Sequence, residues 1–209
     1  MSRTADVDGY VLAGGASSRF GRDKAKAEIE GKPMLVRMCD LLRTSGLPRV
    51  TVIGPPKKYR KFDIPCVRDR WPGEGPLGGI ITALLHAGTV SPYRRHIVVV
   101  SCDMPFLTNE WVKSLVGRAI ANDASVTLPQ SDRGFEPLCA CYRSDALQPL
   151  RSAFDSGVRK ITDALKILRT EVLDEKEWKR FDSSGRLFWN MNTVADYEEA
   201  RRVIAAEKT

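Results

Sequence analysis

The stretch Tyr10-Val-Leu-Ala-Gly-Gly-Ala-Ser-Ser-Arg-Phe-Gly-Arg-Asp-Lys-Ala25 decides how this chain is organised. It opens with an apolar run, Tyr10 to Ala13, of a length suited to a buried strand. Gly14 and Gly15 carry no side chains, so the backbone can turn sharply there and approach a ligand closely. Hydroxyls and positive charges follow at Ser17, Ser18, Arg19, Arg22 and Lys24. Exposed amide groups beside such cations predict a polyphosphate site.

This loop fits neither of the two common phosphate-binding templates. A P-loop requires Lys-Ser or Lys-Thr after its last glycine, and none follows Gly21. A dinucleotide fingerprint requires G-x-G-x-x-G, and the glycines here have a different spacing. A plain glycine turn before a solvated basic loop is the alternative. The combination of strand, paired glycines and clustered cations favours the anion site.

The full pattern L-A-G-G-x-S-S-R-F-G-x-D-K-A resembles the signature loop of the molybdenum cofactor guanylyltransferases. These nucleotidyltransferases attach GMP to molybdopterin, and their loop wraps the base and phosphates of the nucleotide. The resemblance implies that Arg19 and Lys24 are catalytic because they stabilise the triphosphate. It also implies nucleotide contacts by the matching positions Leu12, Ala13, Gly14, Gly15 and Lys24.

Length and composition fit one domain that spans residues 1–209. The formal net charge of +7 favours anionic partners. No helix-turn-helix, RNA-recognition or zinc-finger signature is present, so we expect small phosphorylated ligands rather than nucleic acid. No apolar stretch approaches the roughly 18 residues of a membrane span, and no secretion signal opens the chain. Five cysteines without a C-x-x-C pair predict reduced thiols in the cytoplasm.

Strand-like and helix-like segments alternate along the chain as far as residue 129. This alternation predicts a doubly wound α/β fold with a mostly parallel sheet. One mixed strand is expected within 134–142, where Pro137 indicates an edge or a change of direction. The expected strands before it are 10–13, 50–53, 65–68, 96–101 and 124–128, and the expected helices are 34–45, 80–87 and 108–122.

A second glycine-rich segment, Gly73-Glu-Gly-Pro-Leu-Gly-Gly79, reads as a turn at the start of the helix that follows it. Taken alone, it would be an ordinary turn between a strand and a helix. Together with the preceding Asp69, its sequence resembles the second motif of the family. This resemblance implies that Asp69 contacts the purine or the ribose. The family also uses a residue after the second strand, usually asparagine. Here Ile53-Gly54 stands at that place, so a backbone contact at Gly54 is expected.

The run His96–Ser101 is continuous, apolar and β-branched, as in a central parallel strand, and Asp103 follows it. Open α/β sheets bind ligands at the carboxyl ends of such strands. A carboxylate that faces polyphosphate there most simply holds Mg²⁺, so Asp103 is the predicted metal ligand. An N-cap or turn role before Pro105 is the alternative. The pattern D-x-P also matches the family's magnesium aspartate.

Two later segments resemble the family's acceptor side. Pro137 and Leu138 match a segment beside the molybdopterin pocket, although Glu136 stands where the family often has histidine. The run N-x-N-T-x-x-D from Asn190 resembles the C-terminal motif, which implies that Asn190 and Asn192 line the joint between nucleotide and acceptor. A capping role for Asn192 or Thr193 at the last helix explains only one of these residues.

Four motifs therefore occur in the family's order, and the resemblance covers essentially the whole chain. It implies that GTP and molybdenum-bound molybdopterin react, with Mg²⁺, to give the guanine dinucleotide cofactor and pyrophosphate. Molybdoenzymes or their chaperones are then candidate protein partners.

Three alternatives stay open at this point. A cytidylyltransferase for the same cofactor usually reads L-A-A-G, and a sugar-1-phosphate nucleotidyltransferase usually has a longer acceptor region. A nucleotide-binding regulator without catalysis would need the phosphate loop but neither Asp103 nor the two asparagines.

Overall fold

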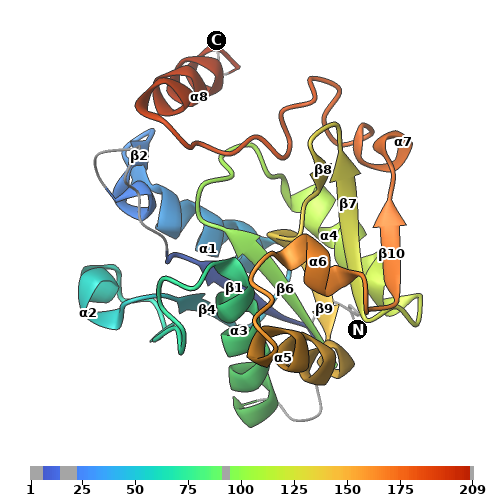
Figure 1. Ribbon diagram of the computed structural model, residues 1–209. Coiled ribbons are helices and arrows are strands. Elements are labelled where there is room, and N and C mark those ends of the chain that lie inside the picture. The colour runs from blue at the N-terminus through green and yellow to red at the C-terminus, as the bar shows by residue number, and fades with distance from the viewer. Residues whose placement is uncertain (1–6, 15–22, 91–94, 208–209) are drawn as a thin grey trace.

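A mixed β-sheet crosses the molecule, and helices cover both of its faces (Figure 1). The computed structural model describes residues 7–14, 23–90 and 95–207. The strand order is β10-β7-β9-β6-β1-β4-β5, and β8 pairs with β7. The strands are β1 (Val7–Leu12), β4 (Val50–Ile53), β5 (Cys66–Val67), β6 (His96–Ser101), β7 (Val126–Ser131), β8 (Gly134–Phe135), β9 (Cys139–Arg143) and β10 (Thr170–Leu173). A separate hairpin joins β2 (Glu28–Ile29) to β3 (Lys32–Pro33).

The direction of the strands confirms the predicted doubly wound, mostly parallel sheet with one mixed strand. β1 is parallel to both β4 and β6, and β10 is parallel to β7. Only β9 within the seven-strand path is antiparallel to its neighbours, β6 and β7. The chain passes from β6 to β7 through a helix and leaves a place between the two strands, which β9 fills from the opposite direction.

The helices divide between the two faces of the sheet. α1 (Met34–Thr44) and α4 (Asn109–Ile120) pack on one face, and α3 (Pro76–Val90), α5 (Leu147–Asp155) and α6 (Ile161–Leu165) pack on the other. The remaining helical elements are η2 (Lys24–Lys26), α2 (Pro56–Tyr59), η3 (Arg60–Phe62), η4 (Ser144–Ala146), α7 (Glu175–Trp178) and α8 (Val194–Ala206). Within the described ranges, no helix combines the length and apolar character needed to cross a membrane.

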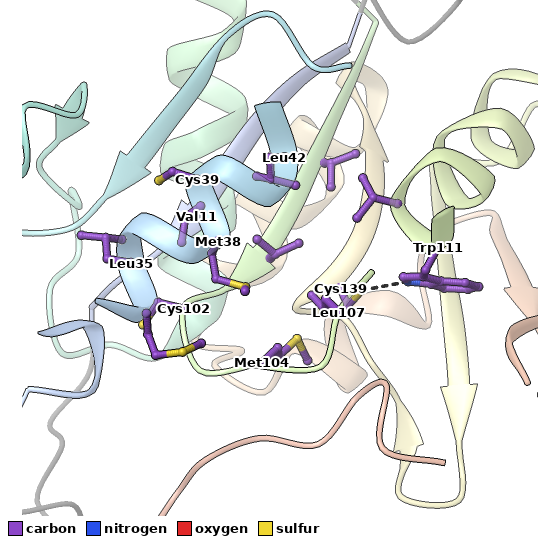
Figure 2. Close-up of a cluster of buried hydrophobic side chains, with 14 of the residues drawn as sticks. Val11, Leu35, Met38, Cys39, Leu42, Cys102, Met104, Leu107, Trp111 and Cys139 are labelled. Atoms are coloured by element: carbon purple, nitrogen blue, oxygen red, sulfur yellow. Dashed lines mark hydrogen bonds between the residues drawn. The ribbon is translucent and has the colours of Figure 1, made fainter. Parts of the chain in front are cut away.

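Alternation along β1 supplies both hydrophobic cores. Val11 points to the α1 side, whereas Tyr10 and Leu12 point to the α3 side, because successive strand residues face opposite ways. Figure 2 shows the first of these cores, in which Val11 lies under α1. Farther along the same core the indole of Trp111 donates a hydrogen bond to Cys139 Sγ at 3.2 Å, which satisfies its buried N–H.

Two local expectations are wrong, and each has a packing reason. The helix expected from residue 80 begins at Pro76, so Gly78 and Gly79 are helical rather than part of a turn. A Cβ on Gly79 would lie 3.2 Å from Leu12 Cδ1, and one on Gly78 would lie 3.1 Å from Trp71 Cβ. Gly79 lets α3 approach β1 closely, and Gly78 lets it approach Trp71 in the segment before the helix. The single strand expected over 134–142 is instead two short strands, β8 and β9, joined by residues 136–138.

Gly54 gives a test of close packing at the end of β4. A Cβ there would lie 3.0 Å from the Ala13 carbonyl oxygen and 3.1 Å from Tyr59 Cε2. We expect Gly54→Ala to lower the free energy of unfolding by about 1–3 kcal/mol, because overpacking forces the backbone to shift. Urea denaturation measures this difference.

The matched control for this substitution is Gly117→Ala. Gly117 lies inside α4, and nothing beyond its neighbours and the adjacent turns of its own helix backbone lies within 4 Å of an added Cβ, so the change should stabilise the helix by up to about 1 kcal/mol. Equal effects of the two substitutions would contradict the close contact at Gly54.

Candidate active site

Three parallel strands end level with one another, and the row of their carboxyl ends forms the edge of the sheet that concerns the site. Leu12, the last residue of β1, is paired with Ile53 of β4 and with Ser101 of β6. The backbone bonds continue one residue further, from the Ala13 amide to the Ile53 carbonyl and from the Cys102 amide to the Leu12 carbonyl. The segments that follow these strands therefore leave the sheet at the same edge, where open parallel sheets bind ligands.

Three predicted site residues meet at this edge. The ammonium group of Lys24 lies 3.1 Å from Asp103 Oδ2 and donates to Asn192 Oδ1 at 2.9 Å. These contacts join positions that are 79 and 168 residues apart in the sequence. The side chains of Lys24 and Asp103 are 17% and 14% exposed, so the ion pair is largely but not fully withdrawn from water.

Asp103 is held in place by two further contacts. The Ser101 hydroxyl donates to Asp103 Oδ1 at 2.6 Å, so both carboxylate oxygens have a partner. The amide of Met191 donates to the Asp103 carbonyl at 3.0 Å and ties the C-terminal segment to this loop. Our sequence reasoning missed Ser101. The available signal was a hydroxyl at the last residue of β6, two positions before the predicted metal ligand.

The two asparagines of the C-terminal segment differ in their surroundings. Thr193 is the N-cap of α8 and forms a capping box with Asp196. Asn192 is therefore not needed as the side-chain cap and presents its amide oxygen to Lys24. The Asn190 amide instead donates to the Phe188 carbonyl at 3.4 Å. The structure thus brings Asn192, but not the side chain of Asn190, to the ion pair.

Tyr59 links the described residues on either side of the glycine-rich loop. Its buried hydroxyl donates to the Ala13 carbonyl at 2.8 Å and approaches Asp23 Oδ1 at 3.4 Å. Asp23 in turn accepts from the Ala25 amide and caps η2, the short helix that begins with Lys24. Sequence reasoning missed Tyr59, because a tyrosine in a lysine-rich connection carries no signal of this contact.

The remaining predicted loop residues are placed in part. Leu12 and Ala13 are buried, whereas Gly14 is exposed. Gly54 is buried and already donates its amide to the Val67 carbonyl. Gly15 and Arg19 lie outside the described residues.

Asp69 lies apart from the ion pair, beyond β5. Two strands, β4 and β1, stand between β5 and β6, which amounts to about 14 Å of strand spacing from β5 to β6. Asp69 Oδ1 accepts from the Trp71 amide and from the Thr82 hydroxyl, both at 3.0 Å. It therefore stabilises the turn that leads into α3.

The predicted acceptor segment adjoins the end of β6. The Leu138 carbonyl accepts from the Ser101 amide at 2.8 Å, and the Pro137 carbonyl accepts from the Tyr142 hydroxyl at 2.8 Å. Glu136 is buried, and the Ser131 hydroxyl donates to its carboxylate at 2.7 Å. Burial raises the pKa of the Glu136 carboxyl above its usual value. The segment thus contacts Ser101, which precedes Asp103 by two positions in the sequence.

The donor set fits a metal that arrives together with phosphate. Among the described residues, no three His, Cys, Asp or Glu side chains come close enough to hold a metal by themselves. Mg²⁺ is usually held by one or two carboxylates together with substrate phosphates and water. Asp103, beside the Lys24 ammonium at this edge, offers one such carboxylate.

Comparison with known proteins identifies the family of this chain. Residues 9–170 match the MobA-like NTP transferase domain. The chain is 31% identical over 201 residues to a molybdenum cofactor guanylyltransferase of Desulfosudis oleivorans, which covers 96% of both chains. It is 30% identical to a probable molybdenum cofactor guanylyltransferase of Peptoclostridium acidaminophilum, over 95% of this chain and 90% of the relative.

Solved structures agree as well. Molybdopterin-guanine dinucleotide biosynthesis protein A from Archaeoglobus fulgidus superposes with a TM-score of 0.79 at 25% identity, over 95% of this chain and 99% of that one. With the match to the domain over most of the sequence, this establishes the family. The chain belongs to the MobA-like NTP transferases.

Proposed function

We propose that this protein transfers GMP from GTP to molybdenum-bound molybdopterin and so forms molybdopterin guanine dinucleotide and pyrophosphate. The observation that carries the proposal is the meeting of Lys24, Asp103 and Asn192 at the ends of the parallel strands. The similarity to molybdenum cofactor guanylyltransferases supports guanine as the base. We assign the reaction to one nucleotidyltransferase domain over residues 1–209. The five free cysteines suit a reducing cytoplasm.

This reaction requires charge neutralisation more than proton transfer. The terminal phosphate of molybdopterin is already an anionic nucleophile, so no strong base is needed. In-line placement of the two phosphates and stabilisation of the leaving pyrophosphate are the main requirements. In this proposal Lys24 and Arg19 contact the triphosphate, and Asp103 holds Mg²⁺. A bound Mg²⁺ supplies divalent countercharge to the phosphates.

The nucleotide would extend from this cluster along the sheet edge toward β5. Backbone groups of Leu12, Ala13, Gly14, Gly15 and Gly54 would line its path. Asp69 would meet the purine or the ribose at the far end. Its Oδ1 holds the local turn, but none of the described residues donates to Oδ2, which suits that oxygen to a ligand.

The acceptor would enter from the opposite side, past the segment between β8 and β9. We assign Pro137, Leu138, Asn190 and Asn192 to this side. Leu138 adjoins Ser101, and Asn192 contacts Lys24, so the acceptor phosphate would approach the same cluster as the nucleotide. Molybdoenzymes or their chaperones would then receive the product.

A non-catalytic nucleotide-binding regulator is the alternative from another class. Such a protein needs a phosphate-binding lysine but has no use for Asp103 and Asn192 beside it. The direct contact of Lys24 with both residues therefore favours the enzyme.

The metal assignment predicts the effect of Asp103→Asn. The fold should persist, because the asparagine oxygen can still accept from Ser101. Turnover should fall by a factor of roughly 100 or more, since one element of charge stabilisation is lost. Pyrophosphate release from GTP with the purified cofactor precursor measures the effect. Asp123→Asn, at a carboxylate that is 95% exposed, is the control and should leave turnover unchanged. Near-normal turnover of Asp103→Asn at saturating Mg²⁺ would refute the assignment.

The phosphate assignment predicts a selective loss in Lys24→Met. GTP should bind about 10- to 150-fold more weakly, which corresponds to about 1.5–3 kcal/mol for a charge-assisted contact. Guanosine should bind nearly as before, because a nucleoside offers the lysine no phosphate. Calorimetric titration of both ligands measures the difference. Lys26→Met removes the same charge from the same short helix, and a comparable loss there would show a general charge effect instead.

The base assignment predicts a change of selectivity in Asp69→Asn. A carboxylate accepts the N1–H and 2-amino groups of guanine but meets acceptor atoms on cytosine. The wild type should therefore prefer GTP to CTP by at least about tenfold. Asparagine keeps an oxygen for Trp71 and Thr82, so the turn should persist while the preference weakens.

The measurement is kcat/KM for each triphosphate. An equal loss for GTP and CTP in the variant would assign Asp69 to the ribose. Equal use of both nucleotides by the wild type would contradict the guanine assignment, and no turnover with either would favour the regulator.

A further inference from the structure

Asp103, the proposed metal ligand, already has a cation beside its carboxylate. The ammonium of Lys24 lies 3.1 Å from Oδ2, and the Ser101 hydroxyl donates to Oδ1 at 2.6 Å. We propose that Lys24 is the resident counterion of Asp103 and blocks metal binding until the phosphates of a nucleotide draw the ammonium away. This inference rests on the proposed function, because it takes Asp103 as the metal ligand and Lys24 as the phosphate ligand.

Metal alone is at a disadvantage in this arrangement. The two side chains are only 17% and 14% exposed, so the ion pair is weakly screened by water. A free divalent ion would have to displace the ammonium and lose some of its own hydration for a single carboxylate. Mg²⁺ gives up water reluctantly, and the described residues supply no cluster of further ligands to offset that loss.

A polyphosphate alters this balance because it competes for the ammonium. Lysine has three rotatable donors on a flexible stem, and here two of them bond to Asp103 and Asn192. Several phosphate oxygens offer the ammonium more negative charge than one carboxylate does. When Lys24 turns to the phosphates, Asp103 Oδ2 loses its partner. It would then be free to bind a metal that the phosphates carry.

The Lys24 side chain can move without loss of the contacts that hold η2. The Asp23 side chain caps η2 through the Ala25 amide, and the Tyr59 hydroxyl approaches the same carboxylate. These contacts fix the start of the helix but do not involve the lysine side chain. The exchange from carboxylate to phosphate is therefore a change of side-chain rotamer on a fixed backbone.

This arrangement predicts that metal and nucleotide bind cooperatively. Nucleotide should raise the affinity of Asp103 for metal beyond the chelation of metal by the free triphosphate. Binding couplings are reciprocal, so bound metal should raise the affinity for the nucleotide by the same factor. Removal of the lysine should then strengthen metal binding in the absence of nucleotide, although it weakens the nucleotide itself.

The test is a titration of the nucleotide-free protein with Mn²⁺, followed by the electron paramagnetic resonance signal of the free ion. Lys24→Met should bind Mn²⁺ roughly tenfold more tightly than the wild type, a factor in the usual range of such couplings. Lys26→Met should change the affinity by less than about twofold, because Lys26 makes no ion pair with Asp103. Lys24→Gln and thermal melting curves check that the gain reflects lost charge in a folded protein.

The outcomes separate this inference from the proposed function. Equal Mn²⁺ affinity in Lys24→Met and the wild type would overturn the counterion role. An equal gain in Lys26→Met would overturn it as well, because a general charge effect would then explain the result. If Lys24→Met gains affinity and the double variant with Asp103→Asn loses the gain, the counterion role is supported. If the double variant keeps the gain, Asp103 is not the ligand, and both the counterion role and the metal assignment fail.

Discussion

Strand β1 is hydrogen-bonded along its length to a parallel neighbour on each side, and the register of these two pairings governs the site. Leu12 is paired with Ile53 and with Ser101, so three strands stop at the same level. A shift of one residue in either pairing would turn the buried side chains of one strand to the wrong face. The cores on the two faces therefore fix where β1, β4 and β6 end, and with that the level at which Asp103 leaves the sheet.

The C-terminal segment reaches this edge through aromatic packing. Phe188 is buried, and its ring meets those of Trp111 and Trp178 edge to face, at centroid distances of 5.4 and 5.3 Å. The next ring, Trp189, stacks on Phe106 at 5.5 Å. Asn192 follows three residues later, and the Met191 amide just before it donates to the Asp103 carbonyl. Aromatic packing and one backbone hydrogen bond therefore deliver this polar residue to the site. This explains how a chain of loops without regular structure can place an amide oxygen within bonding distance of Lys24.

Sequence patterns predict the parts of this protein in which local and global preferences agree. The runs 50–53 and 96–101 are apolar and β-branched, and both are strands with the expected bounds, so Asp103 is correctly placed at the end of a central strand. Gly78 and Gly79 led to a wrong prediction of a turn. They are helical and allow α3 to pack against Leu12 and Trp71, a contact that only the tertiary structure reveals. The contacts of Asn192 with Lys24, and of Tyr59 with Ala13, join segments far apart in the sequence. No periodicity signals such contacts.

The antiparallel course of β9 leaves the other principal strands running in one direction, which gives the two edges of the sheet different uses. Val7, at the start of β1, pairs with His96 on the edge remote from Asp103. α8 starts beside the site at Thr193 and runs for 13 residues, or about 20 Å, to Ala206 (Figure 1). A tag or fusion partner on the amino-terminal side of Val7 would leave the rim that carries the candidate site clear. One joined beyond Ala206 would continue from a helix rooted in that rim, so surface attachment of this protein is better made through its amino-terminal side.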